Sequence, residues 1–252
     1  ILVLHEQGLG DSIQFCRYLR LMGNLGLIIS VLAPLSLHRL FQTIPGVATV
    51  SEKISLSEGH DYYCHMMSLA GIFKTTINNI PFGREPYLFA DPNIVKHWAE
   101  VLQKYSVSPL VGVAWSGGTS SKILGRSLPL KEFIGGLPKN FSYVSLQKEV
   151  LIADNETLAE TPALRHFGSK QHDFFDTAAI IALMDVVVTV DTSVAHLSAA
   201  MGKDTWILLP LTCDWRWLEH RVDSPWYPNV RLYRQYTQND WNPVLGTIKA
   251  DL

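Results

Sequence analysis

The sequence is poor in cysteine. It has three cysteines in 252 residues, far apart and with no CxxC pair among them. An odd, scattered set fits neither a disulfide framework nor a zinc knuckle. Free cysteine is among the most buried residue types. We therefore expect Cys16, Cys64 and Cys213 to be buried thiols of a protein in the reducing cytosol.

Long apolar runs are also missing. The best candidate for a membrane span, Leu25 to Leu37, is shorter than the roughly 20 residues that a span needs and contains Pro34. The sequence shows no signal peptide, so a cytoplasmic location is expected. The chain also lacks an initiator methionine and opens inside a strand-like run, which indicates a piece of a longer protein.

Charge of one sign and several catalytic motifs are absent as well. The chain has 21 Lys and Arg against 23 Asp and Glu, a net charge of −2, which gives no electrostatic case for a nucleic-acid partner. It has no DxD pair, so a divalent metal held by carboxylates is unsupported. It has neither a GxSxG elbow nor a GxxxxGK[ST] loop, which argues against serine hydrolases and P-loop enzymes.

Hydrophobic residues are plentiful, at 47% of the chain, enough for a substantial core. Strand-like apolar runs alternate with helical stretches from end to end, a pattern typical of βαβ units and a mostly parallel sheet. In the first part of the chain, helical spacing covers residues 12–22. The expected strands there are Ile1–Leu4, Leu27–Leu32, Val47–Val50 and Tyr62–His65.

A second α/β series follows a mixed-charge helix at Asn93–Tyr105 and a linker at Ser106–Pro109. We place a domain boundary near residue 107, which gives two Rossmann-like domains, 1–107 and 108–252. Two such domains usually hold a ligand between them, beyond the carboxyl ends of the strands. The expected strands of the second domain are Leu110–Trp115, Tyr143–Leu146, Leu164–Phe167, Val186–Val190 and Thr205–Leu209, and its expected helices are Leu130–Leu137, Phe174–Met184 and Ser193–Met201, before an irregular tail that ends in a short helix.

The stretch HEQGLGDSIQF near the start looks like half of a dinucleotide fingerprint, with Gly8 and Gly10 in a turn before a helix. The third glycine of that fingerprint is Ile13 here, and no acidic residue follows the next strand for a ribose, so a dehydrogenase is disfavoured. The turn instead presents Asp11 at the head of a helix. That carboxylate is either a helix N-cap or a general base, and both interpretations stay open.

Glycines, hydroxyls and two cations follow the first strand of the second domain. Ser116 and Gly117 begin the loop, and Lys122 and Arg126 lie further along it. Such a loop can offer several donors to a phosphate, and the cations can neutralise it. We prefer this hypothesis to a polar surface loop because the segment lies at a strand's carboxyl end. Gln147 also ends a strand, and it either reaches the cleft or lies on the surface.

A buried strand leads into the motif VDTSVAHLSAA. Asp191, Thr192 and Ser193 begin a helix whose N-terminus suits a diphosphate, because its N–H groups and dipole favour negative charge. His196 follows on the second turn. The alternatives are capping for Asp191 and Thr192, and a structural role for the histidine.

Two further segments carry weaker signals. Asp173 and Asp176 in DFFD are typical of a helix start with a capping box. The aromatic segment, residues 214–228 (DWRWLEHRVDSPWYP), either walls a sugar or base or attaches an irregular tail to the core, and we favour the second interpretation.

Five motifs in this order, EQGLGDSIQFCRY, WSGG…RSLPL, DFFDTAA, VDTSVAHLSAA and DWRW…SPWYP, resemble the family 9 glycosyltransferases. The nearest resemblance is to the branch fused behind tetratricopeptide repeats in bacterial proteins, and the heptosyltransferases of lipopolysaccharide synthesis are more distant. The resemblance covers nearly the whole chain.

This resemblance implies a GT-B fold of two Rossmann-like domains, with the acceptor mostly on the first and a nucleoside-diphosphate sugar on the second. It implies an inverting transfer to an acceptor hydroxyl with no metal and no other cofactor. The family's catalytic aspartate matches Asp11, its diphosphate-contacting basic residue best matches Arg126, and its Asp-Thr/Ser pair and histidine match Asp191, Thr192 and His196.

Some properties stay open at this stage. The first domain, about residues 1–92 without its linker helix, is shorter than in the lipopolysaccharide enzymes, so the acceptor is a glycan, a lipid or a protein, with preceding repeats favouring the last. Two other functions remain: a non-catalytic module that binds nucleotide sugars or acts as a scaffold, and a nucleotide-sugar epimerase of the two-domain kind.

Overall fold

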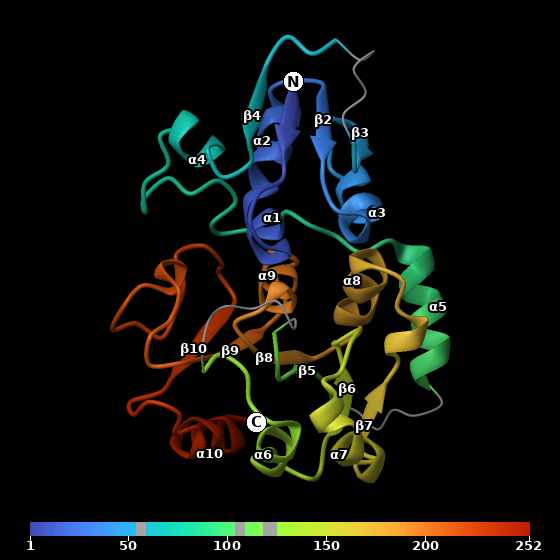
Figure 1. Cartoon of the computed structure of the whole chain (residues 1–252), viewed down its shortest axis with the longest axis vertical. Coiled ribbons are helices and arrows are strands. Elements are labelled where there is room, and N and C mark those ends of the chain that lie inside the picture. Colours follow the sequence, from blue (N-terminus) through green and yellow to red (C-terminus); the bar gives the residue numbers. More distant parts are fainter. Residues whose placement is uncertain (54–58, 104–108, 118–124) are drawn as a thin grey trace.

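A computed structural model describes residues 1–53, 59–103, 109–117 and 125–252. Two parallel β-sheets lie one above the other along the long axis, and the N-terminus is at the far end of the upper one (Figure 1). The expected domain boundary near residue 107 lies outside the described residues. Lys122 does too.

The N-terminal sheet has four parallel strands in the order β3-β2-β1-β4. Its central strand is short but anchored, since Val3 is fully buried. These strands match the four that the apolar runs predict. The strands are β1 (Leu2–Leu4), β2 (Ile29–Leu32), β3 (Val47–Ser51) and β4 (Tyr63–His65), and the helices around them are α1 (Leu9–Phe15), α2 (Arg17–Asn24), a 3₁₀ turn (Leu35–Leu37), α3 (His38–Gln42) and α4 (Leu69–Ile72).

The single helix expected over residues 12–22 is wrong in two ways. It starts earlier, at Leu9, and it divides into α1 and α2 at Cys16. The break leaves no mark on the hydrophobic pattern because Cys16 keeps right-handed dihedrals, φ −63° and ψ −12°, so the apolar face continues across it. The early start brings Asp11 into the first turn of α1.

The C-terminal sheet has six parallel strands in the order β10-β9-β8-β5-β6-β7. Every residue of β8 and β9 is buried, as expected for central strands covered on both faces. The strands are β5 (Leu110–Ala114), β6 (Ser142–Ser145), β7 (Leu164–His166), β8 (Val186–Val190), β9 (Thr205–Leu209) and β10 (Val230–Arg234). The helices are α5 (Pro92–Gln103), α6 (Leu130–Gly135), α7 (Asn155–Glu160), α8 (Phe174–Ala182), α9 (Ser193–Ala200) and α10 (Asn242–Asp251), with 3₁₀ turns at Ile152–Asp154, Gly168–Lys170 and Trp215–Trp217.

The tail after Leu209 is more regular than the sequence predicts. It contains β10, which pairs in parallel with β9, and the short terminal helix that was expected. Val230 and Leu232 are buried while Arg231 between them is exposed, the alternation of an edge strand. Five residues amid dense aromatic neighbours are too few for this alternation to stand out in the sequence.

One apolar core joins the two sheets. It runs from Val3 and Ile13 of the N-terminal part to Val187 and Leu197 of the C-terminal part. A second core lies on the other side of the C-terminal sheet, under α6 and α10. The shared core places α1 directly over α9 and α3 beside α8 (Figure 1). The segments that follow the carboxyl ends of β1 and β8 therefore meet.

The cysteines are reduced, but only Cys16 is buried. Cys64 and Cys213 are half-buried, so the expectation of three buried thiols is wrong for two of them. Among the residues that the structure describes, no helix combines the length and apolar character that crossing a membrane requires.

Candidate functional site

Helix α1 packs tightly against α9 at Gly10. A Cβ atom on Gly10 would lie 2.9 Å from Cδ2 of His196 and 3.6 Å from Cα of Ser193. The residue is part of α1 rather than of a loop, so the expected loop position is wrong, and its lack of a side chain serves helix packing. The left-handed residue of the turn is Gln7, with φ 61°, while Gly8 has an ordinary φ of −90°.

Asp11 is the third residue of α1. Gly8 is the N-cap, so the N-cap interpretation of Asp11 is wrong, but the carboxylate still closes the helix start. Its Oδ2 accepts a hydrogen bond of 2.8 Å from the Gly8 N–H. Its Oδ1 forms an ion pair with the guanidinium of Arg216, 205 residues away in the chain. The side chain of Asp11 is 16% exposed.

Arg216 comes from the aromatic segment and was not predicted as a site residue. Besides Asp11 it contacts Asp214 through Nη1, at 2.7 Å, and it donates from Nε to Oε1 of Gln14. The interpretation of this segment as an attachment to the core accounts for Trp217, Trp226 and Tyr227, which are buried. That interpretation does not account for the ion pairs of Arg216, whose side chain is only 8% exposed.

His196 is held as a neutral ring. Its Nδ1 shares a 2.8 Å hydrogen bond with the Tyr227 hydroxyl, and its ring stacks on Trp217 with centroids 5.2 Å apart. Burial, with the positive charges of Arg17 and Arg126, lowers the pKa of His196 to about 3. The Nε2 atom lies 4.0 Å from Oδ1 of Asp191. At neutral pH this histidine offers a hydrogen bond and no charge.

Asp191 follows β8 directly and is 6% exposed. Burial raises the pKa of its carboxyl to about 6, although the nearby Arg126 acts in the opposite direction. Thr192 is the N-cap of α9, but its side chain makes no capping bond and instead lies 3.3 Å from the hydroxyl of Thr189. Ser193 is the first, partly exposed residue of the helix. The Thr192 side chain thus leaves the first-turn N–H groups of α9 free of a cap.

Gln147 is not a surface residue. It is 7% exposed, and its Oε1 accepts hydrogen bonds from the backbone N–H groups of Trp115 (2.7 Å) and Ser116 (2.8 Å). Its Nε2 donates to Oγ of Ser116 and to the carbonyl of Glu149. The amide therefore holds the loop after β5 in shape.

Arg126 packs against that same loop. A Cβ on Gly117 would lie 2.5 Å from Nη2 of Arg126, so the glycine lets the guanidinium lie flat on the backbone. Its Nε is buried without a hydrogen-bond partner in the described structure. Its charge acts on both Asp191 and His196. Arg126 therefore lies near Asp191, which precedes the N-cap of α9. The loop's other predicted cation, Lys122, lies outside the described residues.

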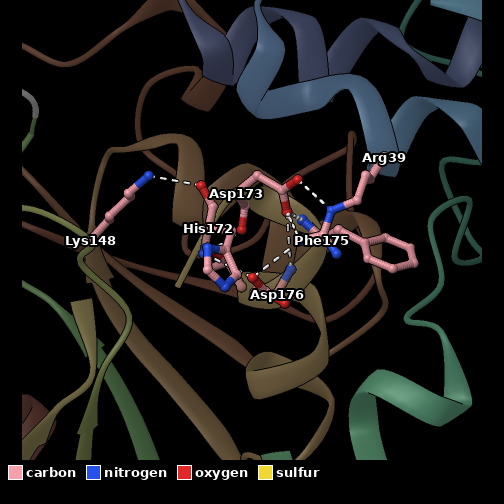
Figure 2. A network of polar contacts seen from close by, with 7 residues as sticks. Arg39, Lys148, His172, Asp173, Phe175 and Asp176 are labelled. Carbon is pink, nitrogen blue, oxygen red and sulfur yellow. Dashed lines mark hydrogen bonds and ion pairs between the residues drawn. The ribbon is translucent and has the colours of Figure 1, made fainter. Parts of the chain in front are cut away.

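A second set of ionic contacts joins α3 to the start of α8 (Figure 2). Asp173 is the expected N-cap, because its Oδ1 accepts from the N–H groups of Phe175 and Asp176. Arg39 of α3 bridges to Asp173 at 2.6 Å and to Asp176 at 3.1 Å. Asp176 accepts from the His172 N–H rather than from the N-cap, so the expected capping box is only half formed.

Across residues 1–53, 59–103, 109–117 and 125–252, no three His, Cys, Asp or Glu side chains come close enough together to hold a metal ion. The charged groups at the α1–α9 contact are arranged as ion pairs and single residues.

Known proteins with this architecture can now be compared. No family model matches the chain. It is 25% identical over 278 residues to protein FlbA of Caulobacter vibrioides, an alignment that covers the whole chain and 46% of that protein. The chain thus spans about half the length of this curated relative.

Two solved structures superpose on nearly the whole chain. Escherichia coli ADP-heptose lipopolysaccharide heptosyltransferase II has a TM-score of 0.63 at 17% identity, covering 99% of this chain and 95% of that one. The glycosyl transferase family 9 protein of Veillonella parvula has a TM-score of 0.65 at 10% identity, covering 93% and 85%. The chain has the GT-B fold. The fold expected from the sequence is confirmed.

The position of Arg216 in the sequence does indicate a site residue, although the sequence analysis did not predict it. Asp214 and Arg216 follow the carboxyl end of β9, the same sheet edge that Ser116 follows from β5 and Asp191 from β8. The rule that ligands bind beyond the carboxyl ends of parallel strands applies to β9 equally. Applied there, it points to Arg216.

Proposed function

We propose that the chain is an inverting, metal-independent glycosyltransferase that moves a sugar from a nucleoside-diphosphate sugar to an acceptor hydroxyl. The observation that carries this proposal is the packing of α1, the helix of Asp11, against the start of α9, with Arg126 close to Asp191. This packing supports a base from the N-terminal part beside an anion site in the C-terminal part. The GT-B fold shared with two glycosyltransferase structures supports the same conclusion.

Each group has a role in this mechanism. Asp11 takes the proton from the acceptor hydroxyl as that oxygen attacks the anomeric carbon. Negative charge then builds on the departing diphosphate. The free N–H groups at Thr192 and Ser193, the dipole of α9 and the guanidinium of Arg126 stabilise it, with a hydrogen bond from neutral His196. Gln147 supports Ser116, which precedes Gly117, beside the diphosphate.

The roles of the two domains and the classes of substrate are part of the same proposal. Residues 1–107 carry the acceptor side and 108–252 the nucleotide sugar. The acceptor is a glycan, a lipid or a protein, and the sugar is a hexose or heptose. The fusion to tetratricopeptide repeats and the cytoplasmic location stay predictions.

A non-catalytic nucleotide-sugar module is the second candidate. One observation favours it: both oxygens of Asp11 already accept bonds, from Gly8 and from Arg216. In that case Asp11 only closes α1 and joins the two sheets.

Donor hydrolysis separates the two. Wild type, Asp11→Asn and the control Asp223→Asn are each incubated with ADP-glucose, UDP-glucose or GDP-mannose in the presence of EDTA. The nucleoside diphosphate that each protein releases is measured. Asp223 is an exposed carboxylate paired with Arg221. We expect release by wild type and control, reduced on the order of 10³-fold in Asp11→Asn, with unchanged diphosphate affinity. Equal rates in all three proteins contradict a base at Asp11, and binding without turnover favours the module.

A further inference from the structure

The base in the proposed mechanism has a partner that comes from the other end of the chain. Arg216 directs one guanidinium to three acceptors: Oδ1 of Asp11, Oε1 of Gln14 and Oδ1 of Asp214. Two of these acceptors are on α1 and one is on the aromatic segment itself. The Asp11 and Arg216 side chains are 16% and 8% exposed, so water screens the pair weakly.

The geometry fixes the direction of the Asp11 carboxylate. The Gly8 N–H binds Oδ2 and the guanidinium binds Oδ1, so both ends of the carboxylate are held. Each oxygen keeps a further lone pair, because an ionised carboxylate has about four acceptor positions. One of these remains for an acceptor hydroxyl. A general base must be oriented toward the proton that it accepts. Its misplacement by about 1 Å can lower the reaction rate on the order of 10²-fold.

The electrostatics fix its charge. An opposite charge in direct contact favours the ionised form of a carboxyl group, and a base must be ionised to take a proton. Asp214 in turn holds Arg216 at 2.7 Å, so the guanidinium itself has a fixed position. The carboxylate comes from α1, and the pair that orients it comes from the segment after β9.

Resting on the function proposed above, we propose that Arg216 is a positioning residue that keeps Asp11 ionised and aimed at the acceptor hydroxyl, with Asp214 as its support. The catalytic base is therefore assembled from both ends of the chain. Neither part presents a complete base by itself.

Other titratable groups lie on the neighbouring elements, and among them the Tyr227 hydroxyl acts on Arg216. His5 is hydrogen-bonded to Ser12 of α1, and burial lowers its pKa. His196 of α9 stays neutral, because burial and nearby positive charge lower its pKa to about 3. Asp191 precedes the same helix, with a pKa of about 6. Asp191 therefore changes its charge within the pH range of the test, so the effect of a change at Arg216 is the difference between the pH profile of the variant and that of wild type.

The test compares Arg216→Gln and Arg216→Lys with Arg39→Gln. Arg39 also bridges the two sheets by an ion pair, but to Asp173 and Asp176, so it controls for a purely structural loss. Donor hydrolysis is measured from pH 4 to 9 with the donor that wild type cleaves, and diphosphate affinity is measured on the same proteins.

We expect Arg216→Gln to lose on the order of 10²-fold in the rate of donor hydrolysis without loss of affinity for the nucleoside diphosphate. The acidic limb of its pH–rate profile should move to higher pH. Arg216→Lys keeps the charge and so keeps the wild-type limb, with an intermediate rate. Arg39→Gln keeps both rate and profile. A wild-type rate and profile in Arg216→Gln overturns the proposal, and so does a parallel fall in rate and diphosphate affinity, which would make Arg216 a donor contact.

A second measurement does not depend on turnover. Thermal unfolding of Asp11→Asn, Arg216→Gln and the double variant gives a double-mutant cycle. We expect strong non-additivity, with little further loss when the second partner is removed. Additive losses overturn the pairing. If wild type cleaves no donor, the proposed function fails, while the cycle still decides whether Arg216 holds Asp11.

Discussion

Two ionic bridges between described residues join the two sheets, and they differ in burial. The outer bridge, Arg39 with Asp173 and Asp176, has an arginine that is 42% exposed and lies over the Phe175 ring (Figure 2). The inner bridge, Arg216 with Asp11 and Asp214, has an arginine that is 8% exposed. Exposed ion pairs are worth roughly 0–1 kcal/mol, whereas breaking a buried pair costs about 3–5 kcal/mol. The inner bridge is therefore expected to contribute more to stability than the outer one, and it is also the bridge that contains the proposed base.

A large loss of stability is also expected at Arg17, beside the inner bridge. This arginine is fully buried, and it donates to the carbonyls of Pro81 and Trp226 and lies 4.5 Å from the Tyr87 ring centroid. Arg17→Met leaves these carbonyls without a donor, so we expect the free energy of unfolding to fall by about 3 kcal/mol. Urea unfolding checks this. Arg84→Met, at an exposed arginine, is the control. Equal stability of the two variants would contradict a stabilising role for the buried hydrogen bonds of Arg17.

A smaller loss is expected at Gly10, where the two helices touch. An alanine Cβ would lie 2.9 Å from His196, so Gly10→Ala must push α1 away from α9. We expect a loss of about 1–3 kcal/mol, typical of an overpacked core, and weaker diphosphate binding because the start of α9 shifts. Gly71→Ala, at a glycine with open space around its Cβ position, is the matched control. Unchanged stability and binding in Gly10→Ala would contradict the close contact.

The charge of Asp191 gives a pH dependence. Its pKa is raised to about 6, so the carboxyl is neutral below that pH and ionised above it. A bound diphosphate is repelled by the ionised form, so nucleotide-sugar binding should strengthen as pH falls through about 6. His196, with its pKa lowered to about 3, stays neutral across this range.

Titration calorimetry with the nucleotide sugar that binds measures the effect from pH 5 to 7.5. The diphosphate of a nucleotide sugar is esterified at both ends and does not itself titrate there. We expect a gain of about tenfold, worth roughly 1.4 kcal/mol, and none in Asp191→Asn. The same slope in that variant assigns the effect to another group.

The smallest effect belongs to the outer bridge. Arg39→Gln removes an ion pair that water screens, so the free energy of unfolding should fall by about 1 kcal/mol or less. The loss should shrink further in high salt. A loss equal to that of Arg216→Gln would remove the distinction between the bridges.

The sequence predicts the architecture well and the long-range contacts poorly. All strands except β10 follow from apolar runs, and most of the candidate residues follow strand ends, where parallel sheets bring them together. The local sequence around Asp11 and around Arg126 is enough to predict both as candidate site residues. The strand β10 and the break at Cys16 were missed because each is hidden in its local pattern.

The pairing of Arg216 with Asp11 has a different cause. It depends on how two sheets pack, and no periodicity within either segment records which arginine reaches which carboxylate across 205 residues. The same is true of Gln147, where the sequence left a surface position open and the structure shows an amide that organises the Ser116 loop. Side chains with long-range partners require the fold before their roles can be assigned.

Thermal-shift measurement with nucleoside diphosphates tests the central claim most directly. UDP, ADP, GDP and NAD are each added with and without magnesium to wild type, Arg126→Ala and the control Arg231→Ala, an exposed arginine on β10. The account predicts that one diphosphate stabilises wild type and control equally with or without magnesium, and that Arg126→Ala loses this stabilisation. Stabilisation by NAD alone, or by no diphosphate at all, would contradict it.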